Sequence, residues 1–317
     1  MSEPRDHHVV PRMHLKWFAK EGWLNRYQVC EDRVRAHGRV SLKKATTVTD
    51  LNRLDDWYAE HTRMESTFGK IEGHAARALA PVLRAAQITN EWPLSNDARN
   101  RVSNWLALQH LRTPRMRQAW DRALQAHLAR PDRDVHVSDL LDNGTLTGDP
   151  EQLARWERVM GVPRKGQPLP RNAYRDLFVE HWPKLSQQLF AHRWMLVVTP
   201  TPAFFTSDNP LVLTRQEIKP ETFFTNSIAI ADYYAARFSW IALSRTHALI
   251  THEVPPELLR RNLDAVLPPH PGQAGLINAA TMMGATLNSE LFQHPDDRII
   301  DDLQDEESIP SDEHPWE

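Results

Sequence analysis

Apolar side chains recur at helical spacing through the first part of the chain. Between about Asp55 and Ala86 they return every three or four residues, which is the pattern of a long helix with one buried face. We expect Asn96 to cap a second helix that runs to about Arg112, and Thr113 followed by Pro114 to begin a third. Two more helices are predicted at 149–160 and 171–192.

The pattern changes near residue 193, where short apolar runs alternate with turn residues. Such runs are typical of strands, and they lie at 194–198, 204–206, 211–213, 237–243 and 247–251. The remaining predicted elements are an alternating β-ribbon at 26–30 and 38–42 and closing helices at 255–264 and 272–292. The expected fold class is therefore α+β and mainly helical, with long helices packed against a small, mostly antiparallel sheet.

We expect one domain over residues 1–304, made of an N-terminal segment with the ribbon, a helical body, the small sheet and the closing helices. Residues 305–317 are rich in acidic side chains and predict a flexible acidic tail. The 317 residues are 41% hydrophobic and 25% charged, so the chain can bury a sizeable core.

Composition excludes several classes of protein. The single cysteine, Cys30, rules out an intrachain disulfide and a cysteine-based zinc or iron–sulfur site. The first residues lack the apolar core of a signal peptide, and no apolar run reaches membrane-spanning length, so we expect a cytoplasmic protein with no membrane partner. The net charge of -3 argues against an overall basic nucleic-acid binder and leaves a local basic groove open.

The long helix carries carboxylates where apolar residues are expected. At 100° per residue, Glu65 and Glu72 fall at the edge of the apolar arc, and His61 falls within it. A carboxylate taken into a core must be paired, hydrogen-bonded, protonated or bound to metal. Two alternatives remain open at this point, namely structural ion pairs with arginine and a functional site.

A second candidate stands between two apolar runs, in the stretch Thr206-Ser207-Asp208-Asn209-Pro210. Asp208 could accept hydrogen bonds from its own backbone in an Asx turn, because such turns favour aspartate shortly before proline. It could equally contribute to a metal or phosphate site. We expect this stretch to be a turn between strands that points Asp208 toward the long helix, and both alternatives agree with that turn.

Several motifs, taken in order, are similar to those of the domain of unknown function 4238 family. They are His8-Val9-Val10-Pro11 with Leu15-Lys16-Trp17-Phe18, the paired-glutamate helix, Gln109-His110-Leu111-Arg112-Thr113-Pro114, Thr206-Ser207-Asp208-Asn209-Pro210, Leu243-Ser244 and Asn278. The likeness covers about residues 8 to 294. The chain departs from the family pattern at Ala242 and Arg245, where prolines are usual, and at His14, where an aromatic residue is usual.

The resemblance implies a shared residue set in a bacterial family whose chemistry is not established. It adds His8 and Asp208 to Glu65 and Glu72 as candidate ligands of a divalent metal such as Mg, Mn or Fe. The candidate catalytic residues are Glu65, Glu72 and Arg112, and the candidate substrate-binding residues are Arg112, Arg115 and Asn209.

We therefore expect a metal-dependent phosphoester hydrolase, with a nuclease as one form of it. Nucleic acids and phosphorylated small molecules are the expected ligands. The alternative is a non-catalytic binding module, associated with defence or stress, whose acidic residues form structural ion pairs with arginine.

Overall fold

The computed structural model describes residues 6–31, 33–49, 63–85, 91–128, 171–215, 236–255, 264–267, 271–285 and 289–307. The helices of this part are α1 (Arg12–Leu15), the 3₁₀ helix η1 (Lys16–Phe18), α2 (Arg63–Arg84), α3 (Asn96–Leu111), α4 (Pro114–Leu128), α7 (Arg171–Ala191), α8 (Pro271–Gly284) and α9 (Ile299–Glu307). The strands are β1 (Asp6–His8), β2 (Trp23–Val29), β3 (Val34–Ser41), β4 (Thr47–Thr49), β5 (Arg193–Val198), β6 (Thr206–Ser207), β7 (Val212–Thr214), β8 (Phe238–Ala242), β9 (His247–His252), β10 (Ala265–Leu267) and β11 (Glu290–Gln293).

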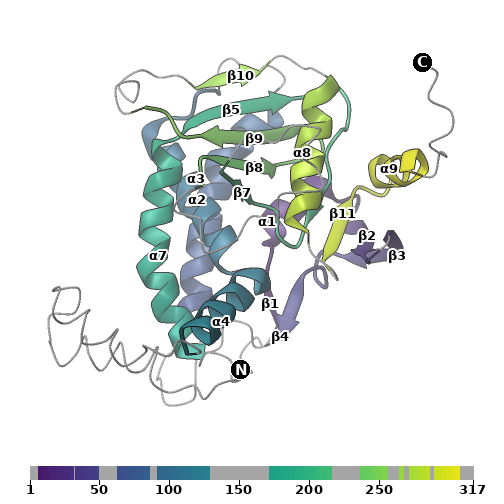
Figure 1. Ribbon diagram of the computed structural model, residues 1–317. Helices are drawn as coiled ribbons and strands as arrows, with labels where there is room; N and C mark the ends of the chain where they lie inside the picture. Colours follow the sequence, from purple (N-terminus) through teal and green to yellow (C-terminus); the bar gives the residue numbers. More distant parts are fainter. Residues whose placement is uncertain are drawn as a thin grey trace, which may run out of the picture.

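A five-stranded sheet in the order β10-β5-β9-β8-β7 forms the centre of the fold. The β10–β5 pair is parallel, and the other pairs are antiparallel. Helices α2, α3 and α7 lie on one side of this sheet, and α8 lies across the other (Figure 1). Because both faces are covered, its strands are apolar at successive positions instead of alternating with polar residues.

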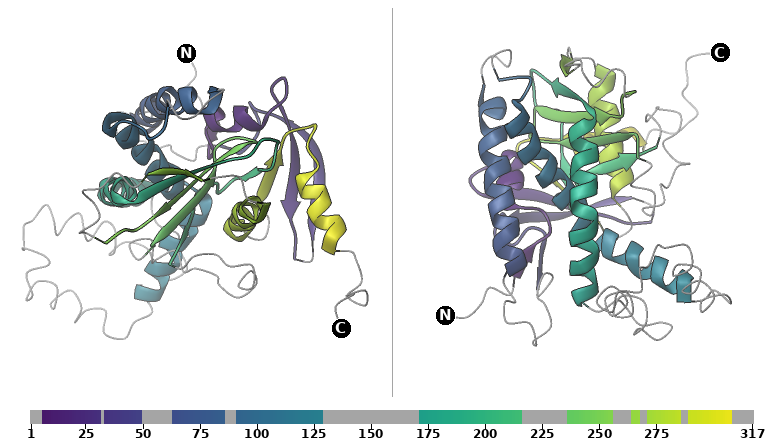
Figure 2. Two further views of the ribbon diagram at one scale, coloured as in Figure 1. Left: turned by 90° about the horizontal axis from the view of Figure 1, so that it is seen from above. Right: turned by 90° about the vertical axis from the view of Figure 1, so that its left-hand side faces the viewer.

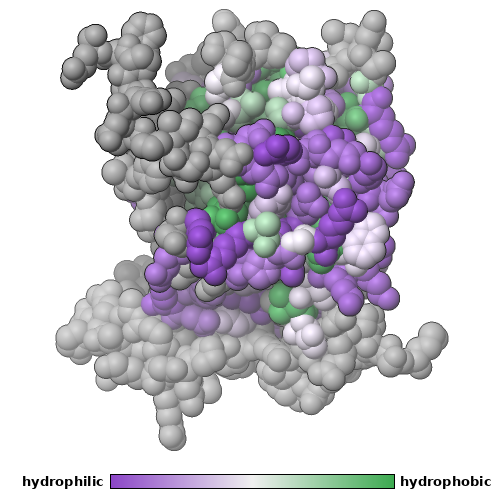
Figure 3. Space-filling view, turned by 90° about the vertical axis from the view of Figure 1, so that its right-hand side faces the viewer, coloured by the Kyte–Doolittle hydropathy of each residue, from purple (hydrophilic) through white to green (hydrophobic). Residues whose placement is uncertain are grey.

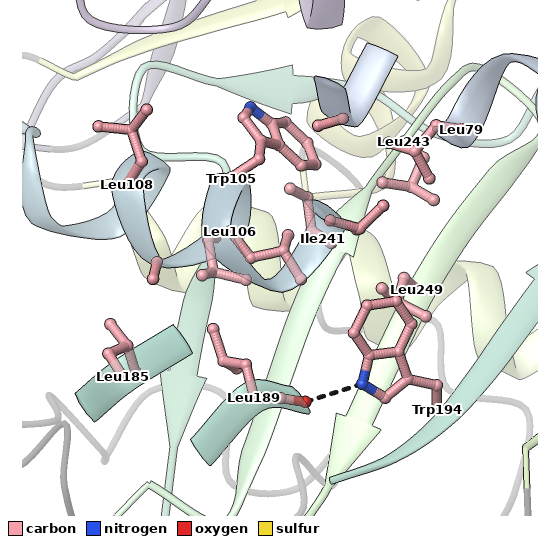
Figure 4. Packing of buried hydrophobic residues seen from close by; sticks show 14 of the residues in the cluster. Leu79, Trp105, Leu106, Leu108, Leu185, Leu189, Trp194, Ile241, Leu243 and Leu249 are labelled. Carbon is pink, nitrogen blue, oxygen red and sulfur yellow. Dashed lines mark hydrogen bonds between the residues drawn. The ribbon is translucent and has the colours of Figure 1, made fainter. Parts of the chain in front are cut away.

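The buried side chains show which face each residue supplies. Leu213, Ile241 and Leu249 pack into a cluster with the helices α2, α3 and α7, and Figure 4 shows several members of this cluster together. Trp194 from β5 belongs to the same cluster, and its indole Nε1 donates to the carbonyl oxygen of Leu189 at 2.8 Å. Neighbouring strand positions, such as Trp240, pack on the opposite face with α8. The sheet therefore divides the core into two parts.

A four-stranded antiparallel sheet in the order β3-β2-β11-β6 lies beside the central sheet, and a two-stranded sheet pairs β1 with β4. Seen from above, β2 and β3 lie next to the yellow helix α9, at the opposite end of the molecule from α7 (Figure 2). Tyr27, Leu291 and Ile300 form part of a small apolar cluster between this sheet and α9. In the described part of the chain, no helix is both long and apolar enough to cross a bilayer.

The predicted fold class, mainly helical with one small sheet, is wrong, because the structure contains sheets of five, four and two strands. The predicted ribbon is extended by β11 and β6 into a second sheet of its own. The helix predicted at 272–292 ends at Gly284, and residues 290–293 form β11 instead. Thr206–Ser207 and Val212–Thr214 were expected in one sheet, yet they belong to two different sheets.

The helix ends follow local capping chemistry. The N-cap of α3 is Ser95, one residue before the predicted Asn96, and its side chain accepts a hydrogen bond from Ala98 N at 3.3 Å. The start of α4 is as predicted, since Thr113 Oγ1 accepts from Met116 N at 3.2 Å.

Some predictions concern residues that lie wholly or partly outside the described ones. The predicted helix at 149–160 lies outside them, as do residues 256–263 of the helix expected at 255–264 and residues 308–317 of the expected tail. His61 also lies outside them.

A tight contact at the end of α8 gives a first testable expectation. A Cβ atom added to Gly284 would lie 2.5 Å from Cγ2 of Val212 and 3.3 Å from the carbonyl oxygen of Asn209, whereas nothing lies within 4 Å at Gly275 of the same helix. We expect Gly284→Ala to lower the free energy of unfolding by about 1–3 kcal/mol, because a stiff β-branched side chain must move. Gly275→Ala is the matched control and should raise stability by about 0.5–1 kcal/mol. Equal effects in denaturant unfolding would contradict the packing argument.

Candidate functional site

A buried ion pair joins α2 to the end of α3. Arg112 follows the last residue of α3, and its Nη1 donates to Glu72 Oε1 at 2.6 Å. The Arg112 side chain is 2% exposed, whereas that of Glu72 is 23% exposed. Glu72, one of the carboxylates that the helical pattern placed at the edge of the core, therefore pairs with arginine and keeps partial contact with solvent.

Gln109 holds the guanidinium of Arg112 from its other side. Its Oε1 accepts from Arg112 Nη2 at 3.1 Å, and its Nε2 donates to the carbonyl oxygen of Val9 at 3.1 Å. Residues three apart lie on one face of a helix, which is why Gln109 and Arg112 meet. Both terminal nitrogens of Arg112 are thus engaged within the protein, so the guanidinium fixes the Glu72 carboxylate relative to the N-terminal segment.

His8, at the end of β1, lies near this ion pair. Its Nδ1 is 3.0 Å from the carbonyl oxygen of Ala45, and because a carbonyl only accepts, Nδ1 carries the proton and Nε2 keeps its lone pair. Burial lowers the pKa of His8, and the charges of Arg12 and Arg112 lower it further, while the bond to Ala45 and the charge of Glu72 raise it. The half-buried His8 is therefore a neutral imidazole whose Nε2 accepts no hydrogen bond from the described residues.

His14 is a neighbour of this cluster that we did not select from the sequence. Its Nε2 lies 3.1 Å from Thr206 Oγ1, and its ring packs 5.4 Å from Phe18 and 5.6 Å from Trp105, centroid to centroid. Burial, with the charge of Arg112, lowers the pKa of His14 to about 3. It fills a position where the resembling family has an aromatic residue, and that departure was the only signal in the sequence.

Asp208 lies where the chain crosses from β6 to β7, and it binds the backbone of β11. Its amide donates to the carbonyl oxygen of Glu290 at 3.0 Å, and its Oδ2 accepts from Glu290 N at 3.2 Å. Burial, with the charge of Glu290 adding to it, raises the pKa of Asp208 to about 6. The side chain of Ser289 also forms a hydrogen bond with this carboxylate and lowers the pKa in part. Asp208 thus ties the crossing segment to the four-stranded sheet.

Asn209 and Arg115 meet at the last carbonyl of α8. Asn209 Nδ2 donates to Gly284 O at 3.1 Å, and Arg115 Nη1 donates to the same oxygen at 2.6 Å. Carbonyls at a helix C-terminus lack partners within the helix, and cationic side chains there are favourable. These two candidate substrate-binding residues therefore cap α8, with Arg115 close enough to Asp208 for the two charges to interact.

The candidate residues thus separate into two groups. His8, Glu72 and Arg112 form one group, and Asp208, Asn209 and Arg115 are held around Gly284 and β11. Glu65 is half-buried on α2, two turns before Glu72. Within the described residues, no three side chains of His, Cys, Asp or Glu come together as a group that could hold a metal ion.

Comparison with known proteins gives a family and no closer relative. No curated protein and no solved structure matches the chain. One family model matches residues 6–297, and it is described as a protein of unknown function (DUF4238). This span includes both groups of candidate residues and all three sheets. The chain therefore belongs to the DUF4238 family.

Proposed function

We propose that the protein is a phosphoester hydrolase that works at the cluster of His8, Glu72 and Arg112. The observation that carries the proposal is a neutral histidine with an open Nε2, close to a carboxylate that is partly exposed and held by a buried arginine. A positioned imidazole or carboxylate can transfer protons in hydrolysis, and such groups typically contribute about 10²–10⁴-fold to rate.

Arg112 acts in this proposal as a positioning residue. Its terminal nitrogens donate to Glu72 and Gln109, and its side chain is almost fully buried, so a phosphate would have to displace these partners to reach it. Its role is to hold the Glu72 carboxylate in one orientation through the hydrogen bond from Nη1.

The proposal includes a divalent ion that water and substrate would help to coordinate. Mg²⁺ sites commonly use one or two carboxylates together with waters and substrate phosphates, and need no closed set of protein ligands. His8 Nε2 and the Glu72 carboxylate would hold such an ion. Bound there, it would supply Lewis-acid polarisation of a phosphoryl oxygen.

The second candidate function, a non-catalytic binding module, is favoured by the ion pair itself. Glu72 already has a charged partner at 2.6 Å, and Gln109 satisfies the other side of that partner. In this alternative the cluster stabilises the contact between the N-terminal segment, α2 and α3, and no reaction takes place there.

The two functions predict different results for a model phosphodiester. After chelation and reloading with Mg²⁺, Mn²⁺ or Fe²⁺, we expect the protein to hydrolyse bis(p-nitrophenyl) phosphate. We expect the substitutions His8→Gln and Glu72→Gln each to lower kcat by about 10²-fold or more. The same ions should raise Tm, since a ligand at 100 times its Kd adds about 2.7 kcal/mol of stability.

Two exposed residues serve as matched controls, His37 on β3 and Glu180 on α7. His37→Gln and Glu180→Gln make the same chemical changes away from the cluster and should keep the wild-type rate. Absence of hydrolysis and of any Tm shift with all three ions would favour the binding module.

A further inference from the structure

The outer strand of the four-stranded sheet carries a concentration of positive charge. β3 is the last strand in the order β3-β2-β11-β6, so within the described residues no strand pairs with its outer edge. Its residues from Arg35 to Arg39 are all exposed, and the turn that follows exposes Lys43 and Lys44. From residue 33 to residue 45 the sequence contains no acidic residue, although the whole chain has a net charge of -3. We call Arg35, Arg39, Lys43 and Lys44 the basic edge.

The cations of the basic edge lack acidic partners among the described residues. Exposed cations elsewhere in the chain do pair with carboxylates, as Lys184 does with Glu180 and Arg237 with Glu253. Edge strands often carry charge that prevents pairing with other chains, but either sign of charge would serve that purpose. A row of one sign without counter-charges instead favours a polyanionic partner.

The backbone of β3 argues against a further strand as that partner. The register between β2 and β3 shifts between Asn25 and Tyr27, and Gly38 has a φ of 76°. Such a bulge twists an edge strand and interrupts its row of hydrogen-bonding groups. The edge is therefore poorly suited to extend the sheet, and side-chain charge remains its available means of recognition.

An exposed aromatic side chain lies beside the basic edge. Trp23 of β2 is 48% exposed, and it is the aromatic member of the exposed large hydrophobic residues of the described part. It pairs with Ser41, while Asn25 pairs with Arg39, so Trp23 and Arg39 are diagonal neighbours on one face of the ribbon. Cations that follow a backbone, with an aromatic ring on which a base can stack, are the features that bind single-stranded nucleic acid.

The basic edge also leads to the proposed catalytic cluster. Lys43 and Lys44 lie in the turn closed by hydrogen bonds from the amides of Lys44 and Ala45 to the carbonyl oxygen of Ser41, each at 2.9 Å. Ala45 follows Lys44 directly, and its carbonyl oxygen accepts the hydrogen bond from His8 Nδ1. A strand of phosphates bound along β3 would therefore be directed toward His8. Figure 3 shows the side of the molecule that carries this sheet, and its described surface is mostly hydrophilic.

We propose that the basic edge and Trp23 bind single-stranded nucleic acid, with the phosphates on Arg35, Arg39, Lys43 and Lys44 and a base stacked on Trp23. Cleavage of the bound strand rests on the proposed hydrolase function, for which this inference names nucleic acid as the substrate class. Binding itself does not depend on hydrolysis and can be measured without any divalent ion.

The test is fluorescence anisotropy of labelled single-stranded 20-mers of DNA and RNA in EDTA, over a range of NaCl concentrations. Four phosphate contacts on a single strand predict a slope of log Kobs against log salt of about -2.8. Arg35→Gln/Arg39→Gln should weaken binding and reduce that slope by about 1.4. Trp23→Ala should weaken binding about tenfold at an unchanged slope, because stacking is not a charge interaction.

The double variant Lys184→Gln/Arg237→Gln is the control, since it removes the same charge from exposed sites elsewhere and should bind as wild type. Absence of binding at 50 mM NaCl, or equal binding by all variants, would overturn the proposal. Displacement by polyglutamate as readily as by unlabelled oligonucleotide would also overturn it, in favour of an acidic protein partner. A preference for duplex over single strands would contradict the role of Trp23.

The activity assay keeps the two proposals separate. Loss of phosphodiester hydrolysis in His8→Gln with unchanged anisotropy would leave the nucleic-acid surface in place. Failure of binding with intact hydrolysis of the small phosphodiester would remove this inference and leave the hydrolase proposal standing.

Discussion

Lowering the pH from 7 to 5 is expected to reduce the free energy of unfolding by on the order of 5 kcal/mol. The cause is a set of buried histidines that stay neutral in the folded protein. Burial lowers the pKa of His14 to about 3 and those of His110 and His192 to about 4. In the unfolded chain all three titrate near their ordinary pKa of 6.5.

The direction follows from which state binds more protons. Below pH 6.5 the unfolded chain gains protons that the folded protein does not accept, so stability is fully present above that pH and falls as the pH drops toward 4. Asp208 opposes the trend in part. Its pKa is raised from 3.8 to about 6, so the folded protein binds a proton at Asp208 at a higher pH than the unfolded chain does. This adds about 1 kcal/mol to the free energy of unfolding by pH 5.

Denaturant unfolding at several pH values measures this effect. Each histidine contributes about 1.4 kcal/mol per pH unit over the titrating range, so His14→Phe should make the acid limb shallower by about that amount. His37, exposed on β3, is the control position, and His37→Gln should leave the slope unchanged. Constant stability from pH 7 to 5 would show that these histidines are protonated in the folded state.

The sequence predicted the existence of most elements better than their assembly. The continuous apolar runs from residue 194 to 251 were identified as strands, because both faces of that sheet are covered and most of its positions are buried. Their partners depend on contacts distant in sequence, which local patterns do not encode. The assignment of Thr206–Ser207 to the second sheet depends on β11, more than eighty residues away, so no local signal could reveal it.

The candidate site shows the same division. Helical phase correctly placed Glu72 at the edge of the core, and the stated requirement for a partner is met by Arg112. Gln109, which binds the other side of Arg112, is part of a sequence motif three positions before it. Its hydrogen bond to Val9 O depends on how the N-terminal segment packs, which the motif does not encode. Asp208 was expected near the glutamates, and its observed partner is instead the backbone of β11.

Arg99→Met is expected to lower the free energy of unfolding by about 3–5 kcal/mol, because it removes one partner of a buried charge pair. Arg99 on α3 contacts Asp264, and the two side chains are 12% and 5% exposed. Its Nε also donates to Phe190 O at 2.9 Å, its Nη2 donates to His192 O, and its guanidinium lies 4.7 Å from the Trp194 ring centroid. One side chain therefore ties α3 to the end of α7 and the start of β5.

The matched control is Arg237→Met, because Arg237 pairs with Glu253 at 3.2 Å with side chains 66% and 57% exposed. Exposed pairs are worth about 0–1 kcal/mol, so this variant should unfold almost as the wild type does. Adding Asp264→Asn to Arg99→Met should recover part of the loss, since the amide removes the unpaired buried charge but keeps an oxygen that can accept from Trp194 N. If both arginine variants lose the same stability, the burial of the Arg99–Asp264 pair has no effect on its contribution. If the second substitution restores nothing, the loss comes from the packing of Arg99 on Trp194 and its bonds to carbonyl oxygens, and the charge pair is not the source.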